Sequence, residues 1–219
     1  MIDLENEFPP LKKYTYLNTA SSGIIPKSVL QWRRAHDQDF FEQGSLFRDD
    51  HKAHIEQIRH TVSRFFNASM DDIALIPNFT FGFNTLLDGF DKSMRFLMLK
   101  GDYPSLRWPV ERREFKHDYV PIDENLEDSI TAVFAKNTPD VFAFSLVQYV
   151  SGIKLSMDFL AQLKSDYPNT IFVADCTQFL GTEAFDFTAS PLDVVVGSCY
   201  KWMLAGYGNG LLFVKDPAK

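Results

Sequence analysis

Seven short apolar runs do most to limit the folds open to this chain. They are rich in β-branched and aromatic residues, and few alternate apolar with polar residues, which is the pattern of strands buried on both faces. Apolar residues recur at helical spacing in intervening or flanking stretches such as 50–66 and 157–167. The runs are 73–77, 95–99, 118–120, 141–147, 171–175, 194–198 and 211–214. Strands that alternate with helices predict an α/β protein, with three layers (α/β/α) and a mainly parallel seven-stranded sheet.

Composition excludes several classes of protein. With 219 residues, 45% of them hydrophobic and 21 of them Phe, the chain can bury a large core, which argues against disorder. A net charge of −7 and the lack of a Lys/Arg block argue against nucleic-acid binding. The apolar runs are too short to span a membrane, and the first residues lack a hydrophobic signal core. We therefore expect a cytoplasmic protein, which its two cysteines also fit.

The first residues differ from the rest of the chain. They form a turn-rich segment, and a helix is expected to open near Pro26. We expect residues 1–25 to be an N-terminal arm, laid over the domain or over a partner, and residues 26–219 to be one large domain.

Polar residues gather where the predicted strands end. Asp175 ends one strand, Ser198 ends the next, Lys201 lies just past it, and Thr80 follows the strand at 73–77. Ligands of open parallel sheets bind beyond the carboxyl ends of the strands, so these side chains are expected to meet in one cleft.

An aspartate and a lysine in one cleft have two interpretations. They can form a buried ion pair that serves structure alone. They can also hold pyridoxal 5′-phosphate (PLP), where a partly desolvated lysine amine condenses with the cofactor aldehyde and a carboxylate keeps the pyridine nitrogen protonated. The segment 78–87 offers what the cofactor phosphate needs, because polar residues lie between a strand end and the start of an apolar helix.

Four motifs in matching order resemble the class V aminotransferase family, the fold type I PLP enzymes that include cysteine desulfurases and kynureninases. The resemblance runs from about residue 14 to the end. The motifs are the opening 16–26, the phosphate-binding turn 77–87, the pair Asp175-x-x-Gln178-x-x-Gly181 and Ser198-x-x-Lys201, and a turn with Gly206, Gly208 and Gly210 before Leu211. The resemblance implies the large domain of a PLP-dependent transferase.

It also implies roles around the cofactor ring. Lys201 would form the Schiff base, Asp175 would pair with the pyridinium nitrogen, and Gln178 would hydrogen-bond the phenolic oxygen. Tyr103 stands where the family stacks an aromatic residue or histidine on the cofactor, although a tyrosine packed at a strand end is a serious alternative. Tyr200 stands where kynureninases have a tyrosine that reaches the phosphate.

Further roles concern the phosphate and the substrate. Thr80, the backbone of Phe79, and Ser198 would hold the phosphate. Gln148 lies in a loop that looks like the kynureninase loop and would face substrate. Arg107 could meet a substrate carboxylate, against the alternative of a surface role.

The expected function is that of a PLP-dependent enzyme acting on an amino acid, of the aminotransferase class V type, in a homodimer. A kynureninase-like hydrolase, a cysteine-desulfurase-like lyase and a non-catalytic α/β binding domain stay open as alternatives. Family members usually continue into a C-terminal small domain, which this sequence lacks.

Other candidate groups are interpreted as structural. Cys176 and Cys199 are expected to pack as small hydrophobes, with a nucleophile or persulfide carrier as the alternative. His51 and His54 share a helix face without an evident third ligand, so no metal site is expected. Residues 111–116 are expected to be a solvated helix face.

Overall fold

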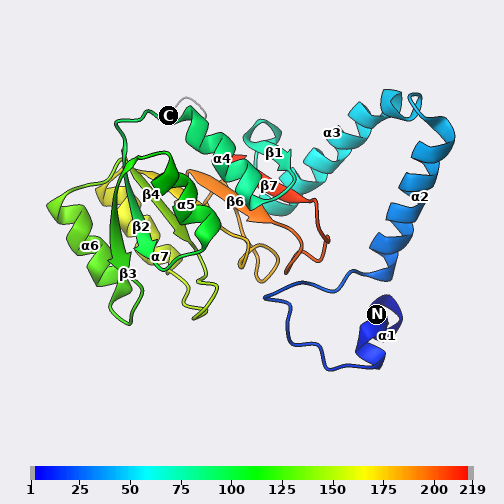
Figure 1. The fold of residues 1–219 in the computed structure, drawn as a ribbon, viewed down its shortest axis with the longest axis horizontal. Coiled ribbons are helices and arrows are strands. Elements are labelled where there is room, and N and C mark those ends of the chain that lie inside the picture. The colour runs from blue at the N-terminus through cyan, green and yellow to red at the C-terminus, as the bar shows by residue number, and fades with distance from the viewer. Residues whose placement is uncertain (1–2, 217–219) are drawn as a thin grey trace.

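A seven-stranded sheet forms the centre of the computed structural model, which describes residues 3–216 (Figure 1). Its strand order is β1-β7-β6-β5-β4-β2-β3. The strands are β1 (Ile73–Ile76), β2 (Arg95–Lys100), β3 (Lys116–Pro121), β4 (Val141–Ser145), β5 (Ile171–Asp175), β6 (Val194–Ser198) and β7 (Gly210–Val214). Each predicted run therefore contains a strand, and the seven-stranded α/β prediction is confirmed.

The sheet is parallel except around β7. Strands β3, β2, β4, β5 and β6 pair in parallel, whereas β7 is antiparallel to both β6 and β1. A parallel return needs a long crossover that usually contains a helix. The link from Ser198 to Gly210 has no helix, so β7 turns back beside β6.

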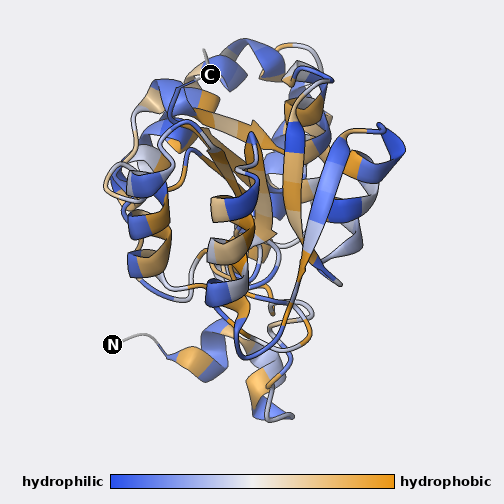
Figure 2. Cartoon of the chain, turned by 90° about the vertical axis from the view of Figure 1, so that its left-hand side faces the viewer, coloured by the Kyte–Doolittle hydropathy of each residue, from blue (hydrophilic) through white to orange (hydrophobic). Residues whose placement is uncertain are grey.

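Helices cover both faces of the sheet. The residues of α4 and α5 pack with one face, and those of α6, α7 and the end of α3 pack with the other. Figure 2 shows the apolar residues concentrated on the strands, with polar residues on the outer sides of the helices. The helices are α1 (Leu4–Glu7), η1 (Pro9–Lys12), α2 (Lys27–Gln43), α3 (Phe47–Phe66), η2 (Met70–Asp72), α4 (Phe79–Gly89), α5 (Pro104–Arg112), α6 (Leu126–Lys136) and α7 (Met157–Asp166). The three predicted layers are present.

The N-terminal part extends away from this body. Helices α2 and α3 form a long hairpin beside the sheet (Figure 1), and none of the α2 residues is buried. Pro26 is the N-cap of α2, where the helix was expected to open. The division into an arm of residues 1–25 and a domain from residue 26 stays a prediction.

The described helices were also compared with the dimensions of a bilayer. Among residues 3–216, none combines the length and the apolar character that crossing a membrane requires.

Candidate functional site

A pocket of about 130 Å³ lies at the carboxyl edge of the sheet. The last residues of three adjacent strands line it: Ser145 of β4, Asp175 of β5 and Ser198 of β6. Asn78, Phe79 and Thr80 at the start of α4 contribute another wall, together with Tyr103 and Ser105 at the start of α5, and Lys201 follows β6. The predicted convergence of these segments on one cleft is therefore observed.

Asp175 is a nearly buried carboxylate, with 6% of its surface exposed. Its Oδ1 accepts a hydrogen bond from the Thr177 backbone N–H at 2.9 Å. Burial raises the pKa of Asp175 to about 7, although the Thr177 hydrogen bonds and the charge of Lys201 act in the opposite direction. The negative charge of Asp102 adds to the increase. A cationic ligand group beside this carboxylate would lower its pKa again.

Lys201 is 8% exposed, and burial lowers the pKa of its amine while the charge of Asp175 partly restores it. Among residues 3–216, no carboxylate lies within 4.0 Å of Lys201 Nζ and no hydrogen-bond partner is found for it. Lys201 and Asp175 thus share a pocket without forming the ion pair of the structural interpretation. A desolvated amine without a partner is more readily neutral, and so nucleophilic, than an exposed one.

The start of α4 lies against the end of β6. The Asn78 side chain caps the helix by accepting from the Phe81 N–H at 2.9 Å, and the Phe79 N–H donates to Ser198 Oγ at 2.8 Å. The N–H of Thr80 has no acceptor among the described residues. One amide, two hydroxyls and the positive end of a helix therefore face one corner of the pocket, which suits an anion.

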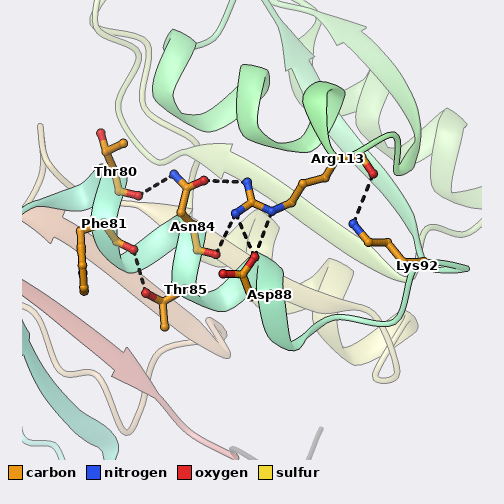
Figure 3. Close-up of polar contacts among 7 residues, drawn as sticks. All are labelled: Thr80, Phe81, Asn84, Thr85, Asp88, Lys92 and Arg113. Carbon is orange, nitrogen blue, oxygen red and sulfur yellow. Dashed lines mark hydrogen bonds and ion pairs between the residues drawn. The ribbon is translucent and has the colours of Figure 1, made fainter.

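Helix α4 is fastened to the segment that follows α5 by Arg113 (Figure 3). The guanidinium donates to Asp88 at 2.9 Å and to Asn84 Oδ1 at 2.6 Å, and Asn84 in turn donates to the carbonyl of Thr80 at 2.8 Å. The prediction of a solvated helix face at 111–116 is therefore wrong for Arg113, which lies beyond the helix end and faces α4.

Three tyrosines line the pocket: Tyr103, Tyr149 and Tyr200. The rings of Tyr103 and Tyr149 meet edge to face, with centroids 5.2 Å apart at 78°. The ring of Tyr200 packs on Tyr207 with a centroid distance of 5.0 Å, and burial raises the pKa of Tyr200. Tyr103 is 39% exposed, so it is not a packed core residue.

Gln178 also lines the pocket, and it connects two other segments. Its Nε2 donates to the Ala20 carbonyl at 2.9 Å, while its Oε1 accepts from Trp202 Nε1 at 2.8 Å. The Gly23 N–H donates to the Tyr200 carbonyl at 2.9 Å, and a Cβ on Gly23 would lie 2.1 Å from the Lys201 carbonyl. The N-terminal segment therefore packs directly on the lysine loop, and only glycine permits this approach.

The two residues predicted to face substrate do not line the pocket. Gln148 is 4% exposed, and its Nε2 donates to the Ser145 carbonyl at 3.0 Å. Arg107 on α5 lies 3.4 Å from Glu111 Oε1 and over the ring of Tyr119. Their substrate contacts stay predictions.

Sequence reasoning missed four residues near the site: Asp102, Ser145, Tyr149 and Thr177. Asp102 directly follows β2, as Asp175 ends β5, so the strand-end rule could have found it. Thr177 falls inside the Asp175–Gln178 motif, and its Oγ1 accepts from the Ser198 N–H at 3.1 Å.

The remaining candidates lie elsewhere or lack reactivity. Cys176 and Cys199 are both buried, and burial raises the pKa of each thiol, to about 12 for Cys199, which disfavours thiolates. His51 and His54 line a pocket between α2 and α3, where His54 stacks on Trp32. No group of three or more His, Cys, Asp or Glu side chains within residues 3–216 is placed to hold a metal ion.

A sequence profile of the family described as Aminotransferase class-V matches residues 15–219. No curated protein sequence matches the chain significantly.

Solved structures match closely in fold at low sequence identity. A C-DES mutant with glycine covalently linked to the PLP cofactor has a TM-score of 0.86 at 18% identity, covering 98% of this chain and 60% of its own. The apo cysteine desulfurase from Thermococcus onnurineus NA1 has a TM-score of 0.82 at 17% identity, covering 98% and 56%. The cystine C-S lyase C-DES with its product cysteine persulfide has a TM-score of 0.83 at 21% identity, covering 94% and 58%. This chain therefore spans roughly 60% of the length of these relatives.

Proposed function

The chain belongs to the class V aminotransferase family, and we propose that it is a PLP-dependent enzyme that acts on an amino acid through a Schiff base at Lys201. One observation carries the proposal: the buried amine of Lys201 and the buried carboxylate of Asp175 line one pocket without pairing with each other. Two buried charges left apart are costly unless a ligand satisfies them.

The donor set fits this cofactor. PLP supplies an aldehyde that a lysine amine can attack and a pyridine ring that withdraws electrons from the substrate. The lowered pKa of Lys201 provides the neutral amine, and the Asp175 carboxylate can hold a proton on the ring nitrogen. Gln178 would turn its amide toward the phenolic oxygen, and Tyr103 would stack on the ring, with Tyr200 near the phosphate.

The phosphate would lie at the start of α4. Thr80 offers an unpartnered N–H and a hydroxyl. The Phe79 N–H already donates to Ser198 Oγ, which leaves the Ser198 hydroxyl hydrogen free to point at an anion. In this arrangement Phe79 orients Ser198, and Ser198 contacts the phosphate.

The reaction type within the family is a finer proposal. We favour transaminase-like chemistry, with a kynureninase-like hydrolase as an alternative. The solved relatives named as a desulfurase and a C-S lyase favour a lyase as the second candidate. A sulfur-accepting cysteine is not offered by Cys176 or Cys199, since both are buried and neither lines the pocket.

The partners belong to the proposal as well. We infer a homodimer from the exposed apolar side chains of the N-terminal part, which include Leu17, Trp32, Phe40 and Phe41. A cytoplasmic location is proposed because both cysteines are free thiols. Amino-acid identity, amino acceptor and pathway stay open.

A visible absorption spectrum tests the proposal. Purified protein mixed with PLP should develop the band of a protein-bound Schiff base, and borohydride should then attach the cofactor to the peptide that contains Lys201. Failure to bind PLP would support the non-catalytic binding domain instead. Asp175→Asn should still form the Schiff base but turn over substrate much more slowly.

A further inference from the structure

Asp102 is a second buried carboxylate next to the proposed site. It directly follows β2, and only 1% of its surface is exposed. Within the described range 3–216, no Lys, Arg or His nitrogen lies within 4.0 Å of it. A buried charge without a counter-ion is retained only if hydrogen bonds compensate for its lost hydration.

Four donors supply that compensation. The Oδ1 atom accepts from the Tyr103 N–H at 2.7 Å and from Ser145 Oγ at 2.5 Å. The Oδ2 atom accepts from the Ser145 N–H at 2.7 Å and from Gln148 Nε2 at 3.5 Å. One carboxylate thus joins the turn after β2 to the turn after β4.

Each of these turns carries a tyrosine of the pocket. Tyr103 follows Asp102 in the chain, and Tyr149 follows Gln148. The Gln148 loop closes on itself, because the Gln148 N–H donates to the Ile153 carbonyl at 2.8 Å. The two rings then meet edge to face at the pocket wall.

We propose that Asp102 is a positioning residue that fixes the rings of Tyr103 and Tyr149 where they flank the cofactor ring. The proposal rests on the proposed function. It assigns the buried side chain of Gln148 to the Asp102 cluster, defined as Asp102, Ser145 and Gln148, rather than to substrate. The carboxylate also raises the pKa of Asp175, so the cluster acts on the pocket by charge as well.

A double-mutant cycle tests whether Asp102 acts through Tyr103. Asp102→Asn places an amide donor opposite the N–H of Ser145 and should weaken PLP binding by about tenfold, with reduced circular dichroism of the bound cofactor. In a Tyr103→Ala background the same change should have almost no further effect. An equal loss in both backgrounds would overturn the proposal.

A second measurement needs no cofactor. In protein labelled with 3-fluorotyrosine, Tyr103→Phe and Tyr149→Phe assign the two fluorine signals. Ser145→Ala, which removes a single donor to Asp102, should shift or broaden both signals. The control Ser190→Ala removes a hydroxyl that bonds the Phe187 carbonyl outside the pocket and should leave both unchanged.

The outcomes separate the two proposals. Signals that are unchanged in Asp102→Asn and Ser145→Ala overturn the positioning role, whatever the cofactor result. If the native protein does not bind PLP but the signals move, the proposed function fails and the control of ring position by Asp102 stands.

Discussion

The backbone N–H of Phe79 donates a 2.8 Å hydrogen bond to Ser198 Oγ, which joins the first turn of α4 to the last residue of β6. This contact connects residues that are 119 positions apart in the chain. It builds the corner of the pocket where the phosphate is proposed to bind.

Ser198→Ala should therefore affect both stability and cofactor binding. The buried Phe79 N–H loses its acceptor, at a cost of about 1–3 kcal/mol in the free energy of unfolding. PLP affinity should fall by about tenfold or more, measured by titration. Thr80→Ala is the matched control, because Thr80 is exposed and should lower PLP affinity with little loss of stability. Unchanged affinity in both variants would contradict the phosphate assignment.

Lys201→Ala should abolish the adduct trapped by borohydride. Because the buried amine has no protein partner, its removal should leave the stability of the cofactor-free protein unchanged or slightly higher. Lys154→Ala is the control, since Lys154 is partly exposed and pairs with Glu183. Mass spectrometry of the reduced protein decides, and cofactor still attached to the Lys201→Ala chain would identify another lysine.

The pH dependence of stability should report on Asp175. Its folded pKa of about 7 lies above its unfolded value near 3.8, so the folded state binds the proton more tightly. The stability it contributes is present at low pH and is lost as pH rises from about 4 to about 7, by at most about 1.4 kcal/mol per pH unit.

Urea unfolding of the cofactor-free protein across this range checks the prediction. Asp175→Asn should flatten the pH dependence, whereas the exposed control Glu56→Gln should not. The same slope in native protein and Asp175→Asn would rule out the raised pKa. Bound PLP should also reduce the slope, because a pyridinium partner lowers the pKa of the carboxylate.

Arg113 should stabilise the position of α4. Arg113→Ala removes the bonds to Asp88 and Asn84 (Figure 3) and should cost about 1–2 kcal/mol in unfolding free energy, because these are charged hydrogen bonds that are partly buried. The adjacent Arg112 is exposed, so Arg112→Ala is a matched control that should change stability little. Equal effects of the two substitutions would argue against the contact.

The oligomeric state tests the exposed apolar side chains. Trp32 is 51% exposed and Phe41 82% exposed on a helix that has no buried residue. Light scattering coupled to size exclusion should give the mass of two chains at micromolar concentration, and Trp32→Ser with Phe41→Ser should shift it toward one. A single-chain mass at every concentration would reject the homodimer.

The sequence by itself determined the sheet and its functional edge. Strands buried on both faces read as continuous apolar runs, so all seven could be located from local composition. Because β5 and β6 run in parallel, the residues that end them, Asp175 and Ser198, had to lie on the same edge, with Lys201 close behind. Local patterns were sufficient here because the side chains sit at fixed positions relative to their own strands.

Only the tertiary structure decided how these groups are paired. Sheet order places β4 between β2 and β5, which no local pattern reveals, and this brings Asp102 to Ser145 and Gln148. The same order leaves Lys201 without an ion pair and buries Asp175, which sets their pKa values. Hydrogen bonds and desolvation depend on neighbours that are distant in the chain, so protonation and orientation of the site are properties of the fold.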